Sequence, residues 1–144
     1  MELIYKKDKA FADEKELLRE CVADLESKGY VKKTYLDSIL AREATYPTGI
    51  ESTVNFALCH TEITHVTDNC LYVINLEKSI EFGNMAEPGQ KLDVKLVFIL
   101  VFNSPSAHLS ALQSIVAFMS EKSKVESFVK LNEVDGLNYL KEEL

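Results

Sequence analysis

The chain has 144 residues, and we expect residues 1–144 to form a single domain. Hydrophobic residues make up 47% and charged residues 27% of it, which is ordinary globular composition and argues against a disordered chain. The net charge of −7 argues against a nucleic-acid partner, because a phosphate backbone would meet an acidic surface.

Two helices are predicted near the start of the chain. Asp13 and Glu16 have the spacing of a capping box, which marks a helix start. The apolar residues that follow at helical spacing are Leu17, Leu18, Cys21, Val22 and Leu25. A second helix is expected to begin near Thr34 and to end before Pro47, because the residue before a proline is disfavoured in a helix. Residues 46–49 (Tyr-Pro-Thr-Gly) then predict a turn.

Strands are predicted in the middle of the chain. Apolar and small or polar residues alternate over residues 53–58, and residues 70–75 form a second run rich in large apolar side chains. Residues 96–102 are apolar on both faces, which is typical of a central strand buried on both sides. Weaker patterns at residues 3–5 and 79–82 predict possible edge strands.

Three helices are predicted for the last third, over residues 109–119, 125–131 and 134–144. A central strand that is buried on both faces requires helices on each side of the sheet. The sequence therefore predicts an α/β fold, a three-layer α/β/α sandwich with a central mixed sheet flanked by helices.

The cysteine pattern and the apolar runs point to a cytoplasmic protein. Cys21, Cys59 and Cys70 are odd in number and form no CxxC pair, so neither a disulfide framework nor a zinc ribbon is expected. The N-terminus lacks the long apolar run of a signal peptide, and the run at residues 96–102 is too short to span a bilayer. We expect no cofactor and no resident metal.

The residues around His60 carry the clearest chemistry. The chain has no nucleotide-binding loop and no GxSxG motif. His60 ends the strand predicted over residues 54–59 and opens a polar stretch at residues 61–65, a place where α/β proteins gather ligand chemistry. A neutral imidazole can accept a phosphoryl group as a covalent intermediate and release it again. It needs a hydrogen bond on its other ring nitrogen and donors around the phosphoryl oxygens.

Two segments carry a resemblance to a known family. Residues 39–50 (ILAREATYPTGI) and 56–66 (FALCHTEITHV) resemble the mannitol/fructose class of phosphotransferase-system enzyme IIA, most of all its galactitol-specific branch. That family shows an LxRE element, a turn ending in TGI or TGL, and a strand ending in a proline–histidine pair. Its histidine is the phosphorylation site, which corresponds to His60.

The resemblance implies a phosphocarrier with defined partners. The phosphocarrier HPr would phosphorylate His60, which would donate to a cysteine of enzyme IIB, which in turn phosphorylates a galactitol-like sugar entering through the permease IIC. Arg42 matches the family arginine near the phosphohistidine, and its planar guanidinium suits a phosphoryl group. His108 resembles a second histidine of some members. Supporting roles at His60 are expected for His65, Thr61 and Glu62.

One departure from the family pattern lies next to the candidate nucleophile. The family usually has proline before its histidine, whereas this chain has Cys59, which restores a backbone donor and a free φ angle. We expect the loop to be looser or the partner to differ. Glu43, which follows Arg42, is expected on the solvent side of its turn.

Four alternatives stay open. Cys59 beside His60 suggests a Cys–His hydrolase, although neighbouring strand residues point to opposite faces. His60, His65 and His108 could together ligate zinc, without a strong local spacing. The chain could also be a regulator that binds partners according to the phosphorylation of His60. The last alternative is an interaction module in which His60 is not phosphorylated.

Overall fold

The computed structural model describes residues 2–144. Its elements are, in chain order, β1 (Leu3–Lys9), α1 (Glu14–Ser27), α2 (Tyr35–Thr45), β2 (Gly49–Ile50), β3 (Phe56–Cys59), the 3-10 helix η1 (Ile63–His65), β4 (Cys70–Gly83), β5 (Lys91–Val101), α3 (Pro105–Met119), α4 (Lys122–Lys130) and α5 (Glu133–Glu143). Within this described part, no helix is long and apolar enough to cross a membrane.

The strands form one mixed sheet in the order β1-β4-β5-β3-β2. Strand β4 pairs parallel with β1 and antiparallel with β5, and β3 pairs parallel with β5 and antiparallel with β2. The register places Cys59 of β3 beside Ile99 of β5. Because β3 and β5 are parallel, their carboxyl ends lie at the same edge of the sheet.

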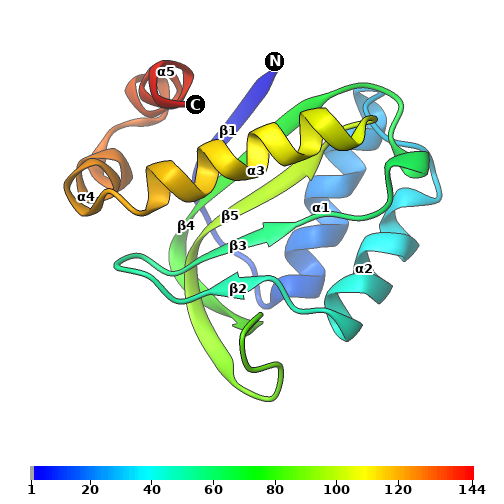
Figure 1. Cartoon of the computed structure of the whole chain (residues 1–144), viewed down its shortest axis with the longest axis horizontal. Helices are drawn as coiled ribbons and strands as arrows, with labels where there is room; N and C mark the ends of the chain where they lie inside the picture. The colour runs from blue at the N-terminus through cyan, green and yellow to red at the C-terminus, as the bar shows by residue number, and fades with distance from the viewer. Residues whose placement is uncertain (1) are drawn as a thin grey trace.

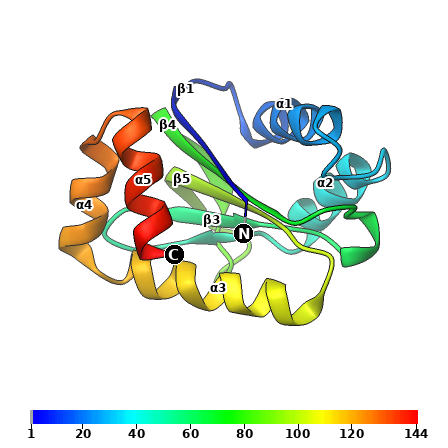
Figure 2. The same ribbon diagram turned by 90° about the horizontal axis from the view of Figure 1, so that it is seen from above.

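Helices cover both faces of the sheet, as predicted. Helices α1 and α2 lie on one face and α3, α4 and α5 on the other (Figures 1 and 2). Strand β5 supplies alternate residues to the two apolar cores that result. Val97 and Ile99 pack in the α1/α2 core, whereas Leu96 and Phe98 pack in the core beneath α3–α5. Burial on both faces confirms the central position of this strand.

Two strand predictions need correction. Residues 79–82 do not form a separate edge strand, because they continue β4, which pairs with β5 on either side of a register shift between Asn75 and Ile80. The predicted turn at residues 46–49 overlaps a strand, since Gly49 and Ile50 form β2 against β3. At Gly49 an added Cβ would lie 2.6 Å from the Gly83 carbonyl oxygen, so the small residue serves close packing as well as the turn.

Candidate functional site

His60 lies directly beyond the carboxyl end of β3, where the sequence predicts it. The neighbouring strand β5 leads at the same edge into α3, whose first turn carries His108. The parallel pairing of β3 with β5 therefore brings together two histidines that are 48 positions apart in the sequence. The centroids of their rings are 4.8 Å apart, with an interplanar angle of 57°.

The local hydrogen bonding of His60 fixes which ring nitrogen is free. Its Nδ1 lies 2.8 Å from the Leu58 carbonyl oxygen, which only accepts, so Nδ1 carries the proton. The Nε2 nitrogen then has the unshared electron pair. Burial lowers the pKa of His60, and the charges of His108 and Arg42 lower it further, against the opposing hydrogen bond to Leu58. A neutral imidazole with a free Nε2 is a competent nucleophile.

Arg42 supplies the positive charge of the site. It lies in the last turn of α2 and is half-buried, with its guanidinium carbon 5.6 Å from the centroid of the Tyr46 ring. Its Nε is buried and makes no hydrogen bond to any of residues 2–144. A buried donor without a partner is costly, and an anionic oxygen would satisfy it. Arg42 lines an open cavity of about 510 Å³ together with His60 and His108.

The remaining walls of this cavity come from the loop after His60 and from the start of α3. They are formed by Thr61, Glu62, Ile63, Thr64 and Pro105. Thr61 is buried and its hydroxyl is hydrogen-bonded to that of Ser38 on α2, so it holds the loop against this helix. Glu62 is exposed at the rim of the cavity.

His65 does not lie in this cavity. Its Nδ1 is 2.7 Å from the Thr34 hydroxyl, and the backbone N–H of Lys32 donates to its carbonyl oxygen. His65 therefore ties η1 to the segment before α2, and its ring is directed to Thr34 rather than to His60. The expectation that His65 helps to orient His60 is replaced by this loop-anchoring contact.

Glu43 is buried, which corrects its expected place on the solvent side of the turn. Only 6% of its surface is exposed, and its carboxylate accepts hydrogen bonds from Thr48 and Cys59. The signal for this position is present in the sequence: Glu43 follows Leu36 by seven residues and Ile39 by four, so it shares their helix face. A charged residue on the apolar face of a helix is expected to be buried and to have hydrogen-bond partners inside the protein.

Cys59 and His60 are directed apart, as the alternation of strand side chains predicts. The Cys59 thiol is fully buried against Glu43 on the α1/α2 side, whereas the His60 ring packs against His108. Burial raises the pKa of the Cys59 thiol well above its ordinary value. A protonated thiol directed away from the imidazole does not form a Cys–His nucleophile.

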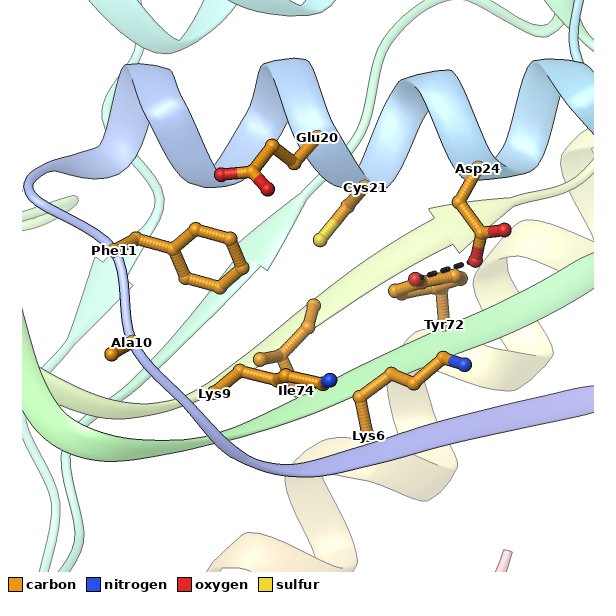
Figure 3. Close-up of a pocket in the computed structure, with 9 residues that line it drawn as sticks. All are labelled: Lys6, Lys9, Ala10, Phe11, Glu20, Cys21, Asp24, Tyr72 and Ile74. Carbon is orange, nitrogen blue, oxygen red and sulfur yellow. Dashed lines mark hydrogen bonds between the residues drawn. The ribbon is translucent and has the colours of Figure 1, made fainter.

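A second polar cavity lies between α1 and strands β1 and β4 (Figure 3). There the Tyr72 hydroxyl donates to the Asp24 carboxylate over 2.8 Å. Burial raises the pKa of the Cys21 thiol in this cavity to about 12, so the thiol is protonated at neutral pH. Lacking both a nucleophile and an unpartnered arginine, this cavity is a weaker candidate than the one at His60. Across residues 2–144, no group of three or more His, Cys, Asp or Glu side chains is arranged to hold a metal ion.

Comparisons with known proteins agree with the geometry. Residues 1–143 match the family model described as "Phosphoenolpyruvate-dependent sugar phosphotransferase system, EIIA 2". The galactitol-specific EIIA component of Escherichia coli K12 is 27% identical over 131 residues, which cover 90% of this chain and 87% of that protein.

Solved structures share the fold. The mannitol IIA of Escherichia coli has a TM-score of 0.76 at 19% identity, with 94% of each chain covered. The Escherichia coli complex of mannitol enzyme IIA with phosphorylated enzyme IIB gives a TM-score of 0.78 at 20% identity, covering 96% of this chain and 94% of that one.

Proposed function

Because this chain belongs to the EIIA type 2 family of the phosphoenolpyruvate-dependent sugar phosphotransferase system, we propose that it carries a phosphoryl group on Nε2 of His60. One observation supports the choice of this residue and of this ring nitrogen. The Nδ1 of His60 donates to the Leu58 carbonyl oxygen, which leaves Nε2 as the free nitrogen of a ring that shares its cavity with Arg42, whose Nε has no partner among residues 2–144.

The transfer is a displacement at phosphorus. The Nε2 electron pair of His60 attacks the phosphorus of phosphorylated HPr, and the bond between phosphorus and its donor atom on HPr breaks, with its electrons returning to that atom. Nδ1 of His60 keeps its proton, and the Leu58 carbonyl stabilises the positive charge that the ring gains. Arg42 neutralises the phosphoryl oxygens, and His108 lines the same cavity beside the His60 ring.

The second transfer reverses these roles. The thiolate of an enzyme IIB cysteine attacks phosphorus, the bond to Nε2 breaks, and His60 returns to its neutral state. The Escherichia coli complex described above, in which a protein of the same fold binds phosphorylated enzyme IIB, supports an enzyme IIB partner. Similarity to galactitol-specific components supports a galactitol-like sugar, taken up through a permease IIC that this chain does not contact directly. We place this exchange in the cytoplasm.

The direct test is incubation with phosphoenolpyruvate, enzyme I and HPr, followed by mass spectrometry of the intact protein. The wild type should gain one acid-labile phosphoryl group, and the His60→Ala variant should gain none. No gain under conditions that label another enzyme IIA would overturn the proposal. Labelling without onward transfer to any enzyme IIB would favour the regulatory alternative over transport.

A further inference from the structure

A buried carboxylate links the two peptides that carry the proposed phosphoryl site. Glu43 Oε1 accepts from the Cys59 thiol at 3.3 Å and from the Thr48 hydroxyl at 2.5 Å, and Oε2 accepts from the Thr48 backbone N–H at 2.8 Å. All three residues are at most 6% exposed. Three donors therefore meet one acceptor group, each through a direct hydrogen bond.

The chain positions of these residues give the contact its significance. Glu43 directly follows Arg42 on α2, and Cys59 directly precedes His60 at the end of β3. The contact between Glu43 and Cys59 therefore joins the neighbours of the proposed nucleophile and of its cationic partner. Thr48 adds a third anchor, because its carbonyl oxygen accepts from the Leu58 N–H at 3.2 Å. Leu58 in turn fixes the His60 ring through its own carbonyl.

We propose that Glu43 is a positioning residue, which sets the distance between Arg42 and His60 by holding the Cys59 thiol and Thr48. This inference rests on the proposed function, since it concerns the geometry of the same phosphoryl site. Glu43 does not touch the phosphoryl group and acts only through its neighbours.

The three groups around Glu43 differ in what they can donate and accept. The Thr48 backbone N–H only donates and fixes Oε2 as an acceptor, whereas the Thr48 hydroxyl and the Cys59 thiol can each donate or accept at Oε1. Burial raises the pKa of Glu43, and the hydrogen bonds from Thr48 and Cys59 and the charge of Arg42 oppose that shift. The other ionisable group facing it is Glu14 of α1, whose pKa is also raised by burial and by Glu43.

The thiol has a function here that a proline could not provide. Proline fixes the backbone by its ring and carries no side-chain donor. At position 59 of this chain, a hydrogen bond from a fully buried thiol restrains the strand end instead. The looser loop that the sequence predicts at this departure from the family pattern is thus compensated by Glu43.

The test compares small changes at Cys59 with a matched control. Cys59→Ala removes the donor, and Cys59→Ser keeps a donor of similar size. Cys70 is also a fully buried thiol but makes no side-chain hydrogen bond to any of residues 2–144, so Cys70→Ala controls for lost volume. We expect Cys59→Ala to lower the rate constant of His60 phosphorylation at saturating phospho-HPr by about fivefold or more. Cys59→Ser should restore most of that rate, and Cys70→Ala should stay within about twofold of the wild type.

A second readout needs no phosphoryl donor. The pKa of His60, followed by NMR titration, should rise in Cys59→Ala, because Arg42 and burial both hold it down in the wild type. If the wild type is not phosphorylated, the proposed function fails while this titration still tests the positioning. An unchanged rate and an unchanged pKa in Cys59→Ala would overturn the inference.

A double-mutant cycle of rate constants at Arg42 and Glu43 distinguishes a positioning role of Glu43 from a general effect on stability. Glu43→Gln keeps one acceptor oxygen and replaces the other with an amide N–H, so the side chain can no longer accept from the Thr48 N–H on one atom and from the Thr48 hydroxyl and the Cys59 thiol on the other. If Glu43 acts by placing Arg42, the double variant Arg42→Gln/Glu43→Gln should be no slower than Arg42→Gln alone. Multiplicative losses in the double variant would overturn the inference. Glu43→Asp serves as a second variant if Glu43→Gln does not fold.

Discussion

The His60 side chain combines low basicity with a fixed tautomer. Burial is the main reason that its pKa lies below the ordinary 6.5. We predict that an NMR titration gives a His60 pKa below 6.5 and that the phosphorylation rate falls only as the pH drops through this lowered value. The unfolded chain takes up the proton first, so the free energy of unfolding should decrease as the pH falls below 6.5. A His60 pKa above 6.5 would contradict the neutral nucleophile.

Arg42 is expected to act mainly by stabilising the negative charge of the phosphoryl oxygens during the transfer. Removing one preorganised donor at such a site costs about 100- to 1000-fold in rate. We therefore predict that Arg42→Gln lowers the phosphorylation rate constant by that amount and raises the pKa of His60, whose protonated form Arg42 repels. The matched control is Arg19→Gln, because Arg19 is exposed on α1. Equal losses in both variants would show that only the net charge matters.

How far the site follows from the sequence differs from residue to residue. His60 and Arg42 could be placed because a polar stretch after a strand and a short motif are local signals. The family resemblance also names His108, but its contact with His60 depends on the parallel pairing of β3 with β5, a long-range contact that no local pattern encodes. Glu43 was misplaced because charged residues are mostly exposed, and its partner Cys59 lies 16 positions away.

At the scale of elements, the start of α3 determines where His108 lies. The Ser104 hydroxyl accepts from the Ala107 N–H at 3.3 Å and caps this helix, one turn before His108. We predict that Ser104→Ala lowers the free energy of unfolding by about 1 kcal/mol. Urea denaturation measures this change, with Ser106→Ala as the control, because Ser106 is exposed and makes no cap. A loss in the control as large as in Ser104→Ala would argue against the cap.

Elements with a strong local period could be predicted, and those defined by pairing could not. The helices and the central strand follow from periodicity and from burial on both faces. Strand β2 has only two residues and exists because Gly49 and Ile50 pair with β3. The length of β4 was underestimated because residues 77–79 are exposed and polar, and only pairing beyond the register shift keeps them within one strand.

At the scale of the whole molecule, the proposed phosphoryl site and the C-terminal helices occupy different parts of the α3–α5 side. Helices α4 and α5 lie on the side of the molecule where β1 is (Figures 1 and 2). His60 follows the carboxyl end of β3, which pairs in parallel with β5. Helix α5 packs on β1 through Gly136, where an added Cβ would lie 2.7 Å from Cε2 of Tyr5. A substitution at Gly136 is therefore expected to change the free energy of unfolding without changing the rate of phosphoryl transfer at His60.

Gly136→Ala tests this separation. The Tyr5 ring cannot easily move, because Asn75 donates to its hydroxyl at 3.0 Å and Phe128 packs on it with centroids 5.2 Å apart. The clash should cost about 1–3 kcal/mol and exceed the gain of up to about 1 kcal/mol from replacing a helical glycine. We predict a net loss of unfolding free energy in urea, with the phosphorylation rate of the folded protein unchanged.

The control for this variant is Gly89→Ala, where an added Cβ would meet nothing within 4 Å. It should be neutral or slightly stabilising, because alanine restricts only the unfolded chain there. If Gly136→Ala were as stable as Gly89→Ala, α5 would not be held on β1 by the Tyr5 contact. If Gly136→Ala slowed phosphoryl transfer in the folded protein, the packing of α5 would reach the His60 edge, and the two parts of this layer would be mechanically coupled.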